Sequence, residues 1–329
     1  MPKFTPVPIV LLAFAAAITL SACSDRGWSS GPTAPSARAR VSMDESVTDL
    51  GAQTYTTIDI PGGSSFQTTL DINDEGVIVG RYLRGGKTYG YLRDETGQFT
   101  TIQYPSAVFT VASGINDRGD IVGHYSLPTS PTVRHGYLLR NGVFTSFDPP
   151  GSIRTNTLGI NDRRDIVGRF VGPDGKTHGF LLRDGEFTTI DYPGATETDL
   201  WKINRRGQIV GAFRTGDGKS HLFVFRKGAF TAIDLPGVVD ISPDKGNINS
   251  RGDVVGVYCA IAPCVLAPTG NHGFLLSEGN FTTLDVPGSA ATIAFGINAR
   301  RDIAGGYTDA NGGTHGFLLS GGERDDDHE

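Results

Sequence analysis

The chain has 329 residues, of which 38% are hydrophobic and 19% are charged, and its formal net charge is −6. Charges of both signs are mixed along it without a basic stripe, which argues against nucleic acid as a partner. The length and the apolar content suffice for one large hydrophobic core, and single β domains of this size are common.

The chain opens with a targeting segment. Lys3 is positive and Val7–Leu20 is an apolar run too short for an ordinary membrane-spanning helix. Leu20-Ser21-Ala22-Cys23 follows and resembles the lipobox of a bacterial lipoprotein. The resemblance implies a signal peptide over 1–22, a lipid on Cys23 and, from Ser24, anchoring in the outer membrane of the cell envelope. An ordinary signal peptide with a coincidental cysteine is the alternative.

Residues 23–53 carry the cysteine and then a stretch rich in Ser, Pro, Gly, Ala and Arg without an apolar period. This composition predicts a flexible tether that holds the following domain off the membrane. At the other end, residues 321–329 are polar and acidic, and we expect a disordered tail.

Residues 54–320 contain one motif written six times. Thr188-Thr189-Ile190-Asp191-Tyr192-Pro193-Gly194 recurs closely as 56–62 and 282–288, and more weakly elsewhere. Between copies come a Gly-Ile-Asn-like triplet, then Ile-Val-Gly, then His-Gly-Phe-Leu-Leu. The triplet asparagines recur at intervals of 43 to 49 residues and are Asn73, Asn116, Asn161, Asn204, Asn249 and Asn298.

Each copy contains four short segments with strand character. In the third copy these are 157–161, 165–170, 178–183 and 187–191, separated by turn-forming residues. Four strands in 40–50 residues are typical of a propeller blade, so we predict an all-β, six-bladed β-propeller of four-stranded antiparallel blades. The repeat region begins with a fourth-strand segment, Tyr55–Asp59, and ends with a third-strand segment, Thr314–Leu319. We therefore expect the N-terminal strand to complete the last blade and close the ring.

A resemblance to a known repeat covers 54–320. Gly-Ile-Asn-Asp-Arg-Gly-Asp-Ile-Val-Gly at 114–123, followed by His-Gly-Tyr-Leu-Leu at 135–139, resembles the bacterial extracellular HAF repeat. The resemblance implies a secreted or surface protein with a propeller-like fold and no assigned biochemical activity. The first and fourth copies depart from it, with Asp71 and Lys202 in place of the glycine of the triplet.

Five of the seven histidines hold the same place in the repeat. A ring of imidazoles could suggest a metal, but a group repeated in every blade is usually architectural. We therefore predict His–Asp hydrogen bonds like those of WD-repeat propellers, and no metal site. The histidines are His135, His178, His221, His272 and His315, and the aspartates are Asp59, Asp148, Asp191, Asp234 and Asp285.

The Asn-Asp-Arg-Gly-Asp turns, such as 116–120, have three interpretations. Their oxygens resemble part of a calcium loop, and Arg118-Gly119-Asp120 matches an adhesion tripeptide. Calcium, however, needs six to eight oxygens. We favour a hairpin turn capped by Asn, with Gly in the left-handed position. Arg164 and Arg301 occupy that glycine position, which predicts strained turns.

Cys259 and Cys264 lie in the longest insertion, within the fifth copy. In an exported protein this pair predicts a disulfide that shapes one loop.

Familiar catalytic motifs and cofactor-binding signatures are missing from the sequence. The stretches after Pro-Gly and before each His-Gly-Phe-like segment differ in every copy, and function usually lies on variable loops of a rigid scaffold. We expect a monomeric, non-catalytic propeller that presents this variable face to a protein or a glycan. The candidate binding residues are Arg154, Asp199, Trp201, Asp240, Lys245 and Phe295.

Two alternatives stay open. The first is a glycan hydrolase or lyase that uses loop carboxylates on the same face, and the second is a purely structural envelope module. We expect contact with the membrane through the lipid anchor only. For Trp201, a place in the core between blades is favoured over a role as a ligand platform.

Overall fold

The computed structural model describes residues 33–39, 42–43, 54–62, 66–259, 264 and 269–320, all within the unit Pro32–Glu329. The predicted signal peptide (1–22), Cys23 and the acidic tail (321–329) lie outside the described residues. In the described part of the chain there are 26 strands and no helix. It follows that these residues offer no helix able to cross a membrane.

Most strands fall into successive antiparallel sets of four. The sets are β4 (Phe66–Ile72), β5 (Ile78–Arg84), β6 (Lys87–Arg93) and β7 (Phe99–Ile102); β8 (Phe109–Ile115), β9 (Ile121–Leu127), β10 (Ser130–Arg140) and β11 (Val143–Phe147); β12 (Arg154–Ile160), β13 (Ile166–Val171), β14 (Thr177–Arg183) and β15 (Glu186–Ile190); β16 (Glu197–Ile203), β17 (Ile209–Arg214), β18 (Ser220–Arg226) and β19 (Ala229–Ile233); and β20 (Asp240–Ile248), β21 (Val254–Cys259), β22 (Asn271–Ser277) and β23 (Asn280–Leu284).

The last strands of the chain are joined by one from its beginning. β24 (Ala291–Ile297), β25 (Ile303–Thr308) and β26 (Thr314–Ser320) form a sheet whose fourth strand is β3 (Thr54–Ile58). β3 pairs antiparallel with β26, with Thr56 opposite Leu318. The first two sets count as one eight-stranded sheet because Thr88 of β6 pairs with Phe109 of β8.

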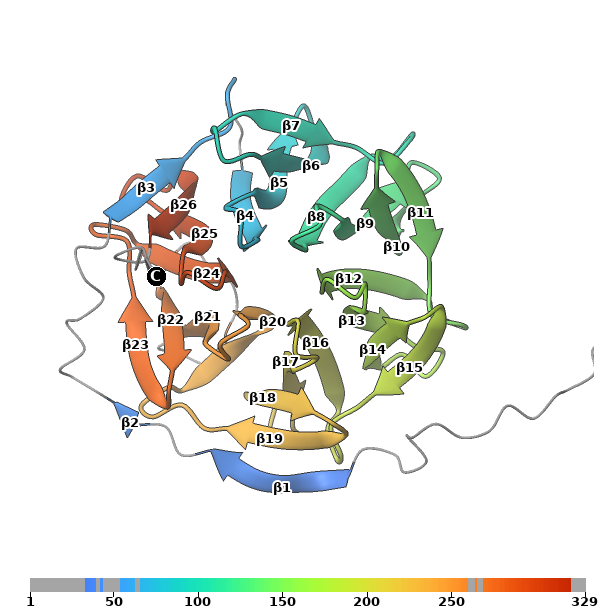
Figure 1. The fold of residues 1–329 in the computed structure, drawn as a ribbon, viewed down its shortest axis with the longest axis vertical. Helices are drawn as coiled ribbons and strands as arrows, with labels where there is room; N and C mark the ends of the chain where they lie inside the picture. Colours follow the sequence, from blue (N-terminus) through green and yellow to red (C-terminus); the bar gives the residue numbers. More distant parts are fainter. Residues whose placement is uncertain are drawn as a thin grey trace, which may run out of the picture. The chain divides into compact units, whose positions relative to one another are not determined.

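The sheets have a β-propeller arrangement, as Figure 1 shows. The first strand of each set, from β4 to β24, lies innermost and points toward the centre. Since each set is an antiparallel meander, the turns after its first and third strands emerge at one end. The loops after its second and fourth strands emerge at the other end, and we call these two ends the turn face and the loop face.

Part of the predicted tether differs from the expectation. β1 (Thr33–Ala39) pairs parallel with β19, and β2 (Ser42–Met43) pairs parallel with β23. Both partners are the last strands of their sets, and an outer strand exposes unpaired backbone groups that can accept another segment. Residues 33–39 and 42–43 are thus strands along two outer edges. The remainder of the predicted tether, residues 23–53, lies outside the described residues.

The Ile-Val-Gly strand of each copy is buried on both faces. In β13, Ile166 and Val167 are at most 3% exposed. A Cβ placed on Gly168 would lie 2.2 Å from the Asn156 carbonyl oxygen and 2.8 Å from the Phe180 ring. Only glycine lets these strands approach so closely, which explains why the motif recurs.

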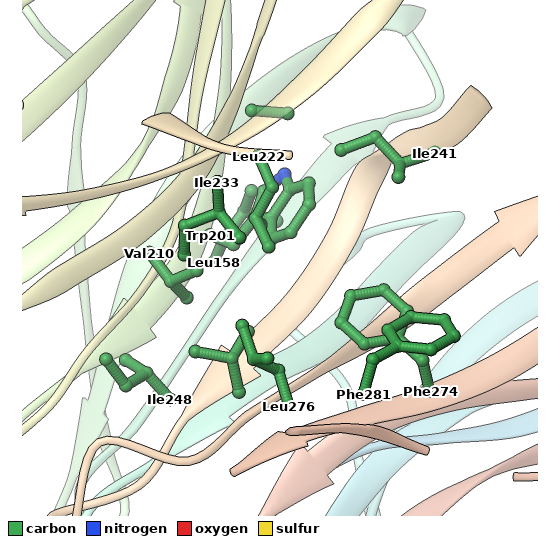
Figure 2. Packing of buried hydrophobic residues seen from close by; sticks show 12 residues of the cluster. Leu158, Trp201, Val210, Leu222, Ile233, Ile241, Ile248, Phe274, Leu276 and Phe281 are labelled. Carbon is green, nitrogen blue, oxygen red and sulfur yellow. The ribbon is translucent and has the colours of Figure 1, made fainter. Parts of the chain in front are cut away.

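Apolar side chains of neighbouring sets bury one another. Figure 2 shows the largest example, in which Trp201 of β16 packs with Leu158 of β12 and Ile241 of β20. Burying one large apolar side chain stabilises a fold by about 1.5–3 kcal/mol, so each set depends on its neighbours for its stability. Gly246 is required here because a Cβ there would lie 2.4 Å from the Trp201 ring.

Candidate functional sites at the two ends of the axis

The turn face is built from one turn repeated after each innermost strand. In the third copy, the Asn161 Oδ1 atom accepts hydrogen bonds from the backbone N–H groups of Arg163 and Asp165, both at 3.0 Å. The glycine position of the turn is left-handed, with φ of 74° at Gly119. The predicted capped hairpin turn is therefore present, and Arg164 (φ 66°) adopts the same strained conformation without being glycine.

The same asparagines also join the copies to one another. The Asn161 Nδ2 atom donates to the main-chain oxygen of Asn204 at 3.3 Å, and each of the others makes the equivalent bond to the next copy. The bonds run from Asn73 to Asn116, Asn161, Asn204, Asn249 and Asn298, and from Asn298 back to Asn73. We call this cycle of side-chain amides the asparagine belt.

Two arginines in strained turns reach back to the preceding copy. The Arg164 Nε atom donates to Asp120 Oδ2 at 2.8 Å, and the Arg301 Nε atom donates to Asp253 Oδ2 at 3.0 Å. Both aspartates are buried. Replacing glycine by arginine therefore gains a charge-assisted bond between copies in exchange for backbone strain.

Three side chains that replace the repeat glycine meet at the axis. The Lys202 Nζ atom donates to Asp71 Oδ2 at 2.8 Å and to the Ser113 carbonyl oxygen at 2.6 Å. The Asn247 Nδ2 atom donates to Asp71 Oδ1 at 2.7 Å. All three side chains are buried, and burial lowers the pKa of Lys202 while the charge of Asp71 opposes that shift. We call these three residues the axial plug.

The glycines that remain at this position show why it is crowded. A Cβ on Gly159 would lie 2.8 Å from the Lys202 Cα, and one on Gly296 would lie 2.9 Å from the Asp71 Cα. Each of the three larger side chains therefore has a glycine at this position in at least one neighbouring copy. Sequence reasoning identified Asp71 and Lys202 as departures but did not bring them together.

A pocket of about 70 Å³ lies between the axial plug and the asparagine belt. A cavity needs roughly 10–15 Å³ to hold one water molecule, so this pocket has room for a few. Ligand sites usually measure about 300–1,000 Å³. The pocket on the turn face is therefore too small for a sugar residue or a peptide side chain of ordinary size.

The predicted His–Asp hydrogen bonds are present in four copies. The imidazole Nδ1 atoms of His135, His178, His272 and His315 lie 2.6, 2.7, 2.9 and 3.0 Å from oxygens of Asp148, Asp191, Asp285 and Asp59. Each imidazole also packs on an aromatic ring of the preceding strand, such as Phe170 with His178 at 5.3 Å between centroids. In the fourth copy, His221 Nε2 instead lies 3.3 Å from Thr215 Oγ1. These contacts make the histidines part of the architecture, and no group of three or more potential ligands in the described part of the chain is arranged to hold a metal.

The candidate binding residues divide by exposure. Arg154 is exposed at the start of β12, where the loop face begins. Asp199, Trp201, Asp240 and Phe295 are each 4% exposed or less, so they offer almost no surface to a large ligand. The side chain of Lys245 lies outside the described residues.

Three of the buried candidates make hydrogen bonds or packing contacts inside the fold and are not available at its surface. Asp199 Oδ1 accepts a hydrogen bond from Arg169 Nη1 at 2.9 Å. Asp240 accepts bonds from the backbone N–H groups of Ser220 at 3.0 Å and Cys264 at 2.8 Å. Phe295 packs with Leu70, Val111 and Val257.

Cys259 and Cys264 form the predicted disulfide, with Cα atoms 5.3 Å apart. The backbone N–H of Cys264 donates to Asp240 and so ties this cysteine to the innermost strand β20. Disulfides form and persist mainly in proteins exported from the cytoplasm, so the pair indicates an extracytoplasmic protein.

Comparison with known proteins gives a fold and no family. No family model and no curated protein matches the chain. Among solved structures, AofleA from Arthrobotrys oligospora is 12% identical with a TM-score of 0.51, over 88% of this chain and 92% of that one. TolB from Acinetobacter baumannii is 13% identical (TM-score 0.49) over 77% of this chain and 54% of its own, and a streptogramin B lyase is 12% identical (TM-score 0.42) over 82% and 98%. At these identities the likeness concerns the fold alone.

Proposed function

We propose that this protein is a non-catalytic binding module of the cell envelope, which presents the loop face of a six-bladed propeller to a glycan or a protein. The observation that carries the proposal is the contrast between the two ends of the axis. On the turn face, one five-residue turn recurs in every copy and is tied into the asparagine belt. On the loop face, by contrast, residues 85–86 connect β5 to β6 whereas 260–270 connect β21 to β22.

The ring in this proposal is closed and has six blades, the last completed by β3. The hydrogen bond from Asn298 to Asn73 supports closure, since it links the sixth triplet to the first. The pairing of β3 with β26 supports it independently. In a closed ring every blade face is covered by a neighbour and the sheet edges are short and protected, which leaves the connecting loops as the parts of the repeat region that can vary without destabilising it.

The proposed location is the envelope, through a lipid on Cys23 and a tether that ends near residue 53. The lipobox-like sequence and the disulfide support this location, because both are features of exported proteins. Lipid chains on the cysteine would hold the domain at a membrane, since each buried CH₂ contributes about 0.8 kcal/mol. Mass spectrometry of the N-terminal peptide from membranes tests this part, and an unmodified Cys23 would contradict it.

A binding screen tests the function. The full-length protein would be applied to a glycan array and to purified envelope proteins, alongside the variants Arg154→Glu on the loop face and Arg118→Glu on the turn face. Both arginines are exposed, so both substitutions make the same change of charge. Binding that Arg154→Glu weakens and Arg118→Glu does not would support the proposal. Binding that neither variant alters, or no binding at all, would contradict it.

A further inference from the structure

At one position of the repeat, the residue type in the first three copies differs from that in the last three. The residue directly after Ile-Val-Gly or its equivalent is basic or imidazole-bearing in the first three copies and small or apolar in the last three. A place that differs between copies is not part of the architecture that every copy shares. The residues are Arg81, His124 and Arg169 in the first half, and Ala212, Val257 and Gly306 in the second.

Two arginines of the first half stack on aromatic rings at the loop face. The Arg81 Cζ atom lies 5.1 Å from the centroid of the Phe66 ring, and the Arg134 Cζ atom lies 4.8 Å from the centroid of the Phe109 ring. Phe66 and Phe109 are the first residues of β4 and β8, two neighbouring innermost strands. Such stacking fixes the plane of a guanidinium group, and a fixed plane suits bidentate recognition of an anion.

The same surface continues into the third copy. The Asn156 side-chain oxygen, in the amide orientation that satisfies its neighbours, accepts from Arg134 Nη1 at 3.1 Å. Asn156 pairs with Arg169 across β12 and β13, and exposed Arg154 begins the same strand. We call Arg81, Arg134, Arg154 and Arg169, with Phe66 and Phe109, the basic sector.

The basic sector gathers four arginines from three consecutive copies, on a chain whose net charge is −6. Within it, Arg169 Nη1 donates to the buried carboxylate of Asp199 at 2.9 Å, and Arg154 is exposed. Phe66, which is 36% exposed, adds an accessible apolar surface beside the charges.

We propose that the basic sector binds an acidic polysaccharide, one that carries carboxylate or sulfate groups along its length. This rests on the proposed binding function of the loop face and names its ligand class. Charges spread over three copies fit a polymer with repeated anions better than a single small anion. An aromatic side chain beside them fits the apolar face of a sugar ring.

An acidic peptide fits the surface less well. Peptides commonly bind a sheet by adding a strand to a free edge. The edges that accept an added strand here are the outer ones, as the pairing of β1 with β19 and of β2 with β23 shows, and the loop face is not such an edge. A ligand that lies across the loop face and needs no strand pairing therefore fits better.

The test is calorimetric titration of the full-length protein with four polymers: polygalacturonate, dextran sulfate, neutral dextran and poly-glutamate. We expect binding of polygalacturonate, dextran sulfate or both, weakening as salt screens the charges. Binding of one anionic polysaccharide and not the other identifies the anion. We expect neutral dextran to fail to bind and poly-glutamate to bind at least tenfold more weakly than the better polysaccharide.

Variants assign the binding to the surface. The double variant Arg134→Ala/Arg154→Ala should weaken binding at least tenfold, whereas Arg118→Ala/Arg251→Ala, which removes two exposed arginines from the turn face, should leave it within twofold. Because Arg134 contacts Phe109, the single variant Arg154→Glu, with an unchanged melting temperature, provides a test independent of folding.

Equal binding of poly-glutamate, equal effects of the two double variants, or an unchanged affinity in Arg154→Glu would overturn the inference. If both acidic polysaccharides fail while the screen finds a neutral glycan or a protein on the loop face, this inference is wrong and the proposed function stands. If the screen also finds nothing, both are wrong.

Discussion

The Asn298 side-chain amide donates a hydrogen bond to the main-chain oxygen of Asn73 at 3.2 Å, between residues 225 positions apart. Every other member of the asparagine belt makes the same bond to the copy that follows it. One residue type thus caps a turn with its oxygen and joins two copies with its nitrogen. The two roles explain why asparagine occurs in all six triplets, even where the turn glycine is replaced by arginine.

The belt predicts a large loss of stability from one substitution. Asn161→Ala removes a cap from two backbone N–H groups and the bond to Asn204, and it leaves buried polar groups without partners. We expect the free energy of unfolding to fall by about 1–3 kcal/mol. The control is Asn311→Ala in an exposed turn, which should change it by less than about 0.5 kcal/mol. Similar losses for both variants in denaturant titrations would show that the belt contributes little.

The axial plug predicts strong coupling between two distant copies. Lys202→Met leaves the buried Asp71 carboxylate without its cation and should cost about 3–5 kcal/mol. Asp71→Asn/Lys202→Met removes both charges and keeps an amide that can still bond Asn247, so most of that loss should be recovered. A double-mutant cycle in denaturant measures this coupling. Additive losses from the two substitutions would contradict it.

Arg164 separates backbone strain from electrostatics. Both Arg164→Gly and Arg164→Ala lose the bond to Asp120, but only glycine relieves the left-handed φ of 66°. We therefore expect the glycine variant to be more stable than the alanine variant by about 1 kcal/mol. The same two substitutions at Arg163, whose backbone is not left-handed, should give the opposite order, with the alanine variant more stable than the glycine variant. The reason is that glycine makes the unfolded chain more flexible. Alanine being the more stable at both positions in thermal unfolding would refute this explanation.

The His178 contacts predict a dependence on pH. Partial burial opposes protonation, but hydrogen bonds to Asp191 and Asp174 outweigh it and raise the pKa of His178 above its usual 6.5. Because the pKa of His178 is higher in the folded state than in the unfolded chain, its protonation stabilises the fold. This stabilisation is fully present below pH 6.5 and is lost as the pH rises through the pKa of the folded state. His178→Gln should therefore lower the melting temperature more at pH 5 than at pH 8.

Solvent screening keeps the His178 effect small, since its partners Asp174 and Asp191 are well exposed. The matched control is the same substitution in an Asp174→Asn/Asp191→Asn background, where the difference between pH 5 and pH 8 should disappear. A larger effect of His178→Gln at pH 8 than at pH 5 would contradict the assignment.

Local patterns predicted the strands well because alternation and turn residues are local properties. In the third copy, the expected segments 165–170, 178–183 and 187–191 match β13, β14 and β15 to within one residue at each end. The first strand begins at Arg154 rather than near 157, because its polar residues pair with β13 without showing an apolar pattern. The His–Asp bonds were predictable for the same reason, since periodic partners identify each other.

The axial plug and the buried candidates were not predictable in this way. Asp71, Lys202 and Asn247 meet because of their distance from the axis, which the spacing of copies does not encode. Asp199, Trp201 and Phe295 vary between copies, and variation suggested exposure. Innermost strands vary for another reason, since each fills a different space between its neighbours. One signal in the sequence could have indicated the axial plug. Asn247 replaces glycine at the same repeat position as Asp71 and Lys202, so three polar side chains share one place in the repeat.

The central claim is that the repeats close into one ring through β3 and β26, because the loop face exists as a single surface only if they do. The direct measurement is a cysteine cross-link between Thr56 and Leu318, which lie opposite each other across that pairing. On mild oxidation, Thr56→Cys/Leu318→Cys should form an intramolecular disulfide in the monomer, detected by intact mass and on non-reducing gels. Thr188→Cys/Leu318→Cys, with the first cysteine at the same repeat position in β15, should not. Equal cross-linking in both variants, or cross-linked dimers in place of monomers, would contradict ring closure.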